Sequence, residues 1–312
     1  MGQPSESHGT VPGARASDAS AAPGVDTPSQ PDVETPSGKD AAYENFPVGS
    51  FLLPARLRPH IARFYAFARA IDDIADSPDL TPEEKVRRLN GFESAILGGM
   101  TGDAAYATAH HMRDSLAETD ITPRHCQDLI DAFRQDAVKN RTDDWDDLMH
   151  YCIRSAAPVG RYLIDLHGGS AHGYGPSDAL CNALQVINHL QDCQDDYRTL
   201  DRVYLPADWM AQAGATVEDL DKPACTPELR QVIDRCLDAT GSLLGEARPI
   251  AAGMHSRRLG MEAAAIWEIA RRLTVELRRR DPLAGRVALT KTGYLMCCAS
   301  GVLGALTGRY GR

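Results

Sequence analysis

The sequence contains no uninterrupted apolar run of the roughly 18 to 20 residues that a membrane-spanning helix needs. Its longest weakly polar stretch, residues 294–307, is shorter and rich in glycine, and we expect a packed terminal helix there rather than a membrane-surface anchor. Basic residues are also in deficit, since 33 Lys and Arg stand against 43 Asp and Glu and the net charge is −10. We therefore expect no nucleic-acid partner, because binding to a phosphate backbone needs a basic face.

Cysteine and histidine patterns typical of disulfide frameworks or metal centres are absent as well. The eight cysteines have no C-x-x-C spacing, and the vicinal pair Cys297 and Cys298 is a poor structural disulfide, so we expect the reduced thiols of a cytoplasmic protein. The ten histidines include no H-E-x-x-H motif. The glycine-rich stretch 168–175 lies between two expected helices and lacks the strand-turn-helix context of a nucleotide-binding fingerprint.

Residues 1–40 are rich in Pro, Ser, Gly, Ala and Asp and have almost no large apolar side chains. Such a segment cannot bury enough surface to offset the entropy lost on ordering, so we expect a disordered leader. A signal peptide is not expected, because no basic start is followed by a hydrophobic run. Residues 41–312 have a suitable length for one domain with a sizeable core.

Helix-start signals recur along the chain, whereas alternating strand patterns are nearly absent. Thr81-Pro82-Glu83-Glu84 joins an N-cap threonine, a proline at the first helical position and a glutamate three residues after the cap. Such signals and the apolar periodicity predict helices at 55–77, 82–97, 104–119, 123–140, 144–167, 177–198, 227–248, 257–280 and 286–307. The predicted fold is therefore an all-α, single-domain helical bundle.

Two acidic clusters lie 120 residues apart, each at the end of an apolar-periodic segment. Each continues backwards through polar residues spaced three or four apart: Tyr65, Arg69, Asp72 and Asp76 in the first, and Gln185, Asn188, Asp192 and Asp196 in the second. This spacing returns to one helical face, so each helix should present a column of polar side chains. A single D-x-x-x-D pair is often a solvated surface, but two columns with matching Arg, Tyr, Asn and Gln are not what a solvated face or a core requires. The additional Asp195 leaves open which of Asp195 and Asp196 faces a metal ion.

Columns of carboxylate and amide oxygens suit Mg²⁺, which is usually bound by a few carboxylates together with substrate phosphates. If both columns face one cavity, they can hold Mg²⁺ against a phosphorylated substrate. The expected metal ligands are Asp72, Asp76, Asn188, Asp192 and Asp196.

At these residues the sequence resembles the squalene/phytoene synthase family of head-to-head prenyl synthases. The column from Tyr65 to Asp76 is similar to the first Asp-rich motif of that family, and the column from Gln185 to Asp196, with residues 202–206 after it, is similar to the second. Residues 151–160 are similar to the Tyr-rich middle segment. The resemblance covers nearly everything from about residue 43 onward and implies an isoprenoid synthase bundle with a central cavity.

The resemblance also implies roles for individual residues. Arg69 and Arg202 would pair with phosphate oxygens through their forked donors, with Gln185 also in contact with substrate. Ring faces for a carbocation would come from Phe51, Tyr65, Tyr151 and Tyr204, with ordinary core packing as the alternative for Tyr65 and Tyr151. Ser50 would contact diphosphate or a water at the cavity mouth, or else cap a helix. The arginines of 271–280 are expected on a solvated helix face.

Within the family, residues 44–54 and 133–139 look most like the bacterial hydroxysqualene synthases of the hopanoid route. This resemblance implies Mg²⁺-dependent conversion of presqualene diphosphate to hydroxysqualene with release of diphosphate. Condensation of two farnesyl diphosphates to presqualene diphosphate or squalene stays open, as do a metal-dependent hydrolase and a non-catalytic lipid-binding subunit that retains the fold. The resemblance further implies a cytoplasmic location with peripheral contact to the inner face of the membrane, and association with other hopanoid-pathway enzymes.

Overall fold

The structure is a computed structural model that describes residue 33 and residues 52–310. Within these residues every regular element is helical, and the only β-type pairing is an isolated bridge between Arg141 and Val203. The predicted all-α class is confirmed. Ser50 and Phe51 lie outside the described residues.

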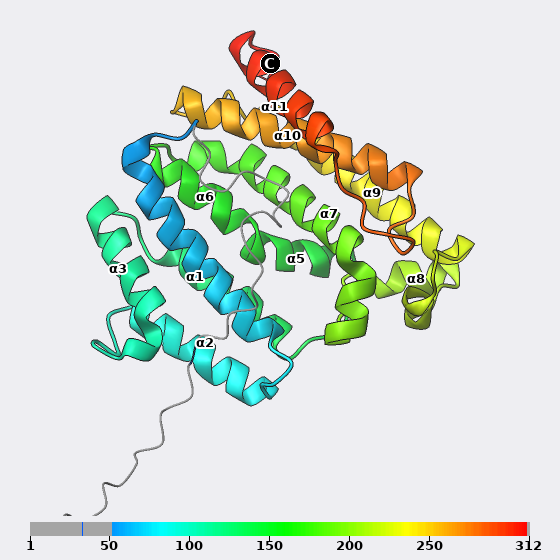
Figure 1. Ribbon diagram of the computed structural model, residues 1–312, viewed down its shortest axis with the longest axis horizontal. Coiled ribbons are helices and arrows are strands. Elements are labelled where there is room, and N and C mark those ends of the chain that lie inside the picture. Colours follow the sequence, from blue (N-terminus) through cyan, green and yellow to red (C-terminus); the bar gives the residue numbers. More distant parts are fainter. Residues whose placement is uncertain (1–32, 34–51, 311–312) are drawn as a thin grey trace, which may run out of the picture. The chain divides into compact units, whose positions relative to one another are not determined.

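Eleven α-helices make up the described part of the chain (Figure 1). They are α1 (Arg58–Asp76), α2 (Pro82–Ile96), α3 (Ala107–Thr119), α4 (Arg124–Asp136), α5 (Trp145–Ser155), α6 (Ala157–Leu166), α7 (Tyr174–Leu200), α8 (Ala207–Ala213), α9 (Pro227–Ala247), α10 (Arg257–Arg279) and α11 (Lys291–Leu306). Short 3₁₀ turns are η1 (Ala55–Leu57), η2 (Ala104–Tyr106), η3 (Ala171–Gly173) and η4 (Val217–Asp221).

Helix starts follow the capping signals of the sequence. The Thr81 side chain accepts a hydrogen bond from the backbone N–H of Glu84 at 3.3 Å, and the Thr226 side chain accepts one from Leu229 at 3.1 Å. Each cap satisfies a backbone donor that has no partner inside the helix, which is a stabilisation of about 1 kcal/mol.

The predicted helices differ from the structure in three places. The single helix expected over 144–167 is two helices, because Pro158 has no N–H to continue the ladder and its ring clashes with the preceding turn, so α5 ends at Ser155 and α6 begins at Ala157. The helix expected from 286 begins only at Lys291, where Thr290 caps it. Helix α8 was not expected, since seven residues are too few to show a helical period.

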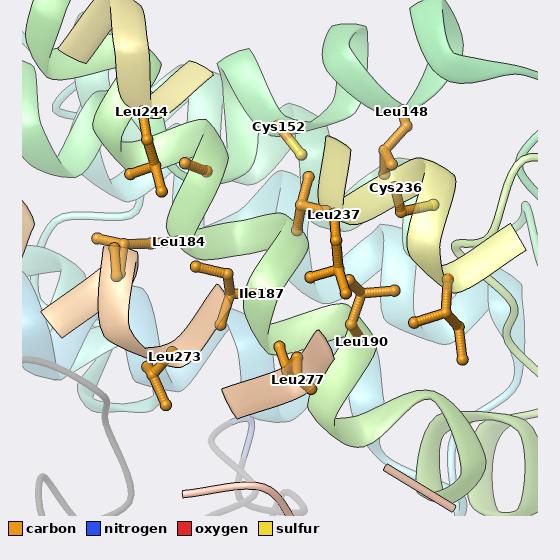
Figure 2. Close-up of a cluster of buried hydrophobic side chains, with 14 of the residues drawn as sticks. Leu148, Cys152, Leu184, Ile187, Leu190, Cys236, Leu237, Leu244, Leu273 and Leu277 are labelled. Atoms are coloured by element: carbon orange, nitrogen blue, oxygen red, sulfur yellow. The ribbon is translucent and has the colours of Figure 1, made fainter. Parts of the chain in front are cut away.

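Helix α7 lies between two groups of buried apolar side chains. One group joins α7 with α5, α9 and α10, and Figure 2 shows Leu184, Ile187 and Leu190 of α7 meeting Leu237 of α9 and Leu273 of α10. The other group joins α1 with α2, α3, α4 and α6. The periodic apolar residues that precede each acidic cluster in the sequence therefore belong to these two buried groups, those of α1 to the second and those of α7 to the first.

The arginines of α10 pair on its outer surface. Arg271 lies 2.9 Å from Glu268, Arg272 lies 2.8 Å from Glu276, and the guanidinium groups of both are about half exposed. This agrees with the solvated helix face expected from the sequence.

Helix α11, red in Figure 1, lies beside α10, which is orange. Small residues form the contact between the two helices. A Cβ added to Gly301 would lie 2.4 Å from Cα of Ala265, so only glycine permits this approach. No described helix combines the length and the hydropathy required to cross a bilayer.

Val33 lies inside the segment expected to form the leader, yet it is buried, and its carbonyl accepts a hydrogen bond from Arg88 at 3.0 Å. The other residues of 1–40 lie outside the described residues, so the boundary at residue 40 stays a prediction.

Candidate active site

A cavity of about 360 Å³ lies among α1, α4, α5, α6, α7 and α10. One stripe of α7 lines it over most of the length of that helix, through Ser177, Leu180, Cys181, Leu184, Gln185, Asn188, His189, Asp192 and Asp196. The first half of this stripe is mainly apolar and the second half polar. Residues of α10, among them Leu259, Ala263 and Ile266, add to the apolar wall.

The facing wall comes from α1, which contributes Ile61, Phe64, Tyr65, Ala68, Arg69, Asp72 and Asp76. The structure therefore brings the two predicted columns to one cavity. Of the neighbouring acids in α7, Asp196 lines the cavity, whereas Asp195 is exposed to solvent. Asp73 is buried and binds Arg69 at 2.8 Å.

Three of the predicted carboxylate ligands are paired with arginines in this structure. Arg69 lies 3.1 Å from Asp72, and Arg202 donates to Asp76 at 2.8 Å. Arg286, from the segment between α10 and α11, donates to Asp192 at 2.6 Å. The polar end of the cavity thus holds cationic and anionic groups in contact with one another.

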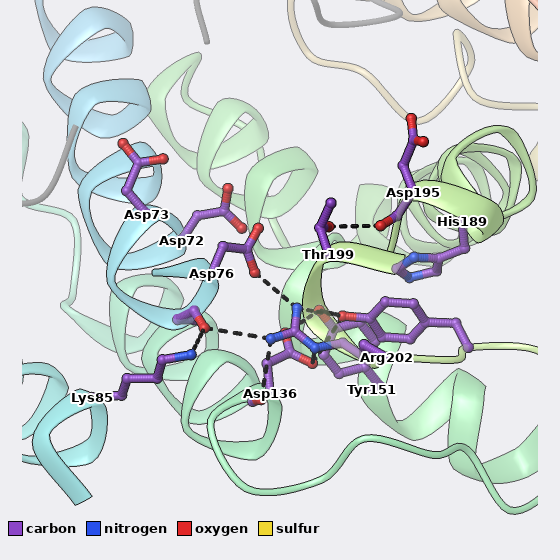
Figure 3. Close-up of polar contacts among 12 residues, drawn as sticks. Asp72, Asp73, Asp76, Lys85, Asp136, Tyr151, His189, Asp195, Thr199 and Arg202 are labelled. Carbon is purple, nitrogen blue, oxygen red and sulfur yellow. Dashed lines mark hydrogen bonds and ion pairs between the residues drawn. The ribbon is translucent and has the colours of Figure 1, made fainter. Parts of the chain in front are cut away.

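A hydrogen-bonded cluster underlies this polar end (Figure 3). Asp136 accepts hydrogen bonds from the hydroxyls of Tyr151 at 2.6 Å and Tyr204 at 2.9 Å. The Nη2 atom of Arg202 donates to the backbone carbonyl of Asp136 at 3.2 Å, and its Nε atom lies 3.8 Å from the carboxylate. Burial raises the pKa of Asp136 to about 6, against the opposing effect of the Arg202 charge.

His189 closes the cluster on the α7 side. Its ring stacks on Tyr204 with ring centroids 3.6 Å apart, and Nε2 lies 3.2 Å from the amide nitrogen of Gln185. Burial, and then the positive charge of Arg202, lower the pKa of His189 to about 3, so the ring is neutral at physiological pH. Six aromatic rings line the cavity, and none of them carries positive charge: Phe64, Tyr65, Phe133, Tyr151, His189 and Tyr204.

All the described site residues expected from the sequence line this cavity. Four further lining residues with a carboxylate, imidazole or guanidinium group were not predicted from the sequence, namely Asp136, His189, Glu262 and Arg286. A signal existed for His189, since it lies one turn after Gln185 on the same stripe of α7. Asp136 lay within the segment 133–139 noted for its resemblance, but no local pattern pointed to Arg286 or Glu262.

The donor atoms at the polar end fit a hard divalent cation, because carboxylate and amide oxygens predominate there. Among the described residues, no three His, Cys, Asp or Glu side chains converge as a ready-made metal site. This is compatible with Mg²⁺, which commonly binds through one or two carboxylates, waters and substrate phosphates.

A helical bundle around one cavity, with facing oxygen donors at one end and apolar walls at the other, defines the isoprenoid synthase class. The sequence model of the squalene/phytoene synthase family matches residues 40–293, and the chain belongs to that family. It is a synthase that uses prenyl diphosphates, and members of the family generally depend on divalent metal ions.

The chain is 47% identical over 260 residues to a hydroxysqualene synthase of Rhodopseudomonas palustris, covering 83% of this chain and 88% of that protein. It is 42% identical over 260 residues to a hydroxysqualene synthase of Zymomonas mobilis, with 83% and 86% covered. Among solved structures, the squalene synthase of Alicyclobacillus acidocaldarius is similar with a TM-score of 0.66 and 30% identity, over 74% of this chain and 87% of that one.

Proposed function

We propose that this enzyme converts presqualene diphosphate and water to hydroxysqualene and diphosphate, in a reaction that depends on Mg²⁺. The observation that carries the proposal is the pairing of two facing carboxylate columns with Arg69, Arg202 and Arg286 at one end of an otherwise apolar cavity. The names of the most similar relatives support the choice of substrate.

The polar end would receive the diphosphate. Mg²⁺ bound to Asp72, Asp76, Asn188, Asp192 and Asp196 would act as a Lewis acid on the leaving oxygens. The arginines now paired with Asp72, Asp76 and Asp192 would exchange carboxylate for phosphate oxygens, which their forked donors bind equally well. Diphosphate binding therefore frees the same carboxylates to take up cations.

The hydrocarbon cation would be stabilised by rings rather than by charged groups. Tyr151 and Tyr204 are fixed by their hydrogen bonds to Asp136, and His189 lies against Tyr204. A neutral imidazole does not repel a carbocation, and phenol rings attract one through their negative faces. Tyr65 offers a further ring from α1.

Water completes the proposed reaction. The C–O bond to diphosphate breaks with both electrons leaving on the phosphate oxygen. The cyclopropylcarbinyl cation then rearranges with opening of the three-membered ring, water adds to the rearranged cation, and one proton is released. The apolar wall from α6, α7 and α10 limits access of other waters, which prevents earlier quenching of the intermediates.

The alternatives are condensation of two farnesyl diphosphates to presqualene diphosphate, and formation of squalene with NADPH as hydride donor. A lipid-binding subunit without catalysis is disfavoured, because both carboxylate columns are intact and line the cavity. Substrate and product of each catalytic alternative are lipids, which supports peripheral membrane contact. The cytoplasmic location and the association with other hopanoid-pathway enzymes stay predictions from the family resemblance.

Product analysis in ¹⁸O-labelled water tests the proposal. Purified protein with Mg²⁺ is incubated with presqualene diphosphate and, separately, with farnesyl diphosphate, each with and without NADPH. We expect a labelled C30 alcohol from presqualene diphosphate at equal rates in both conditions. Squalene that forms only with NADPH would contradict the proposal, and presqualene diphosphate accumulating from farnesyl diphosphate would favour the condensation.

A further inference from the structure

Helix α11 presents large apolar side chains to solvent. Leu295, Met296, Leu303 and Leu306 are between 61% and 68% exposed. Elsewhere in the described part of the chain, the exposed large apolar residues are Leu97, Met100 and Val138, on other elements. Single exposed apolar residues are common, but four on one short helix indicate a surface that another phase or molecule covers.

These four residues share one face of the helix. They lie at relative positions 0, 1, 8 and 11, which fall within one sector at 3.6 residues per turn. The opposite face is made of the buried Cys297, Gly301 and Gly304 and packs on α10. Small residues thus face the protein and large apolar ones face outward, the reverse of an ordinary surface helix. We call the outward face, Leu295, Met296, Leu303 and Leu306, the α11 apolar face.

The charge around this face is positive in an otherwise acidic chain. Residues 287–310 contain no Asp or Glu, and their two basic residues, Lys291 and Arg309, stand near the two ends of α11, whereas the whole chain has a net charge of −10. Arg309 lies 3.5 Å from Glu268, and its side chain is 55% exposed. Arg271 and Arg272 also lie close enough to influence Cys297 of α11 electrostatically. The acids beneath the helix, Glu262 and Glu268, are only 4% and 2% exposed, so they present little negative charge at the surface.

The α11 apolar face also lies close to the cavity. Glu262, Ala263 and Ile266 of α10 line the cavity. Ala264 and Ala265, in the same turns of α10, pack against Gly301 of α11. One helix therefore separates the apolar end of the cavity from the α11 apolar face.

We infer that α11 docks the enzyme on an anionic lipid bilayer, with Leu295, Met296, Leu303 and Leu306 inserted among the acyl chains. The sequence predicted a packed helix rather than a membrane-surface anchor over 294–307, whereas this inference gives the helix both roles, one on each face. Flanking Lys291 and Arg309 contact the lipid phosphates. The choice of a bilayer rests on the proposed function, because a C30 product without a charged group must leave the cavity for a lipid phase. A helix with an apolar face and basic flanks lies in the membrane interface, and its affinity rises with apolar area and with anionic lipid.

Flotation with vesicles tests this inference. The full chain is mixed with phosphatidylcholine vesicles or with vesicles containing about 30% phosphatidylglycerol. We expect the wild type to bind to the anionic vesicles and to bind more weakly when salt is added. The double variant Leu303→Ser, Leu306→Ser should lower the partition coefficient of the protein between water and vesicles at least about tenfold. The matched control is Leu97→Ser, Val138→Ser, which removes two equally exposed apolar residues elsewhere and should bind as wild type.

Equal binding of the α11 variant and the wild type would overturn the inference. So would a wild-type dimer in light scattering that the α11 variant dissociates, since the face would then belong to a second copy. Turnover of presqualene diphosphate in detergent micelles is measured on the same proteins, and there wild type and variant should be equal. A wild type that makes no hydroxysqualene in micelles but floats with vesicles would contradict the proposed function alone.

Discussion

Replacing Arg202 with glutamine should strengthen the dependence of the stability of the protein on pH through Asp136 and extend it to higher pH. Arg202 is 5% exposed, and its positive charge lowers the pKa of Asp136. In the wild type, burial raises the pKa of Asp136 from 3.8 to about 6, so its contribution to stability is present at low pH and is lost as pH rises through about 6. Without Arg202, the pKa should rise further and this loss should continue toward higher pH.

The size of the effect follows from linkage. Each unit by which the pKa of Asp136 rises in Arg202→Gln makes the variant lose about 1.4 kcal/mol more than the wild type as the pH rises above about 6. Near pH 5, the carboxyl group is largely protonated in both proteins, and the remaining deficit comes from the lost hydrogen bonds to Asp76 and to backbone carbonyls. The part that comes from the backbone carbonyls should change little with pH, because carbonyl groups do not titrate.

Urea unfolding in EDTA at about pH 5 and about pH 8 provides the measurement. The double variant Arg202→Gln, Asp136→Asn is the control, because it lacks the titrating carboxyl group, so the loss of stability between about pH 5 and about pH 8 that comes from Asp136 should be absent from it. A deficit of Arg202→Gln that is equal at both pH values would refute the reasoning. A loss of stability with rising pH that is as large in the double variant as in Arg202→Gln would place the titrating group elsewhere.

Three other changes test the site and the fold. Asp72→Asn or Asp192→Asn should lower turnover by about three orders of magnitude or more while the melting temperature stays nearly constant, because both carboxylates lie at the cavity and not in the core. Turnover within a few-fold of wild type for both variants would contradict the hypothesis that the two columns bind metal ions. Gly301→Val should lower the melting temperature markedly, since its side chain meets the backbone of α10, whereas Gly241→Ala, with open space around it, should not. Deleting residues 1–31 should leave turnover and melting temperature unchanged, while deletion through residue 40 should also remove the contact of Val33 with Arg88 and lower the melting temperature.

The sequence predicted those parts of the site that follow a local repeat. The columns on α1 and α7 could be recognised because a helix returns to the same face every three or four residues, and the structure places both at one cavity. The distinction between Asp195 and Asp196 required the position of α7 in the bundle, since the two follow Asp192 at three and four residues and both spacings are helical.

Contacts between distant segments could not be predicted in this way. Asp136 meets Arg202 across 66 residues, and Arg286 meets Asp192 across 94. These pairs depend on where α4 and the segment before α11 pack, which no local period encodes. The break between α5 and α6 was predictable in principle, because Pro158 interrupts the helical ladder, but the strong apolar periodicity on both sides outweighed that signal.

The stripe of α7 that lines the cavity also relates residue number to position along the cavity. From Ser177 to Asp196 it rises about 28 Å at the usual 1.5 Å per residue, and its chemistry changes from apolar to anionic along a single straight axis. The distance of any position from the diphosphate end is then fixed by its residue number. Enlarging Leu180 or Leu184 would shorten the space for the hydrocarbon tail and leave Asp192 and Asp196 untouched. Substrate length and ionisation chemistry can therefore evolve, or be engineered, independently along one helix.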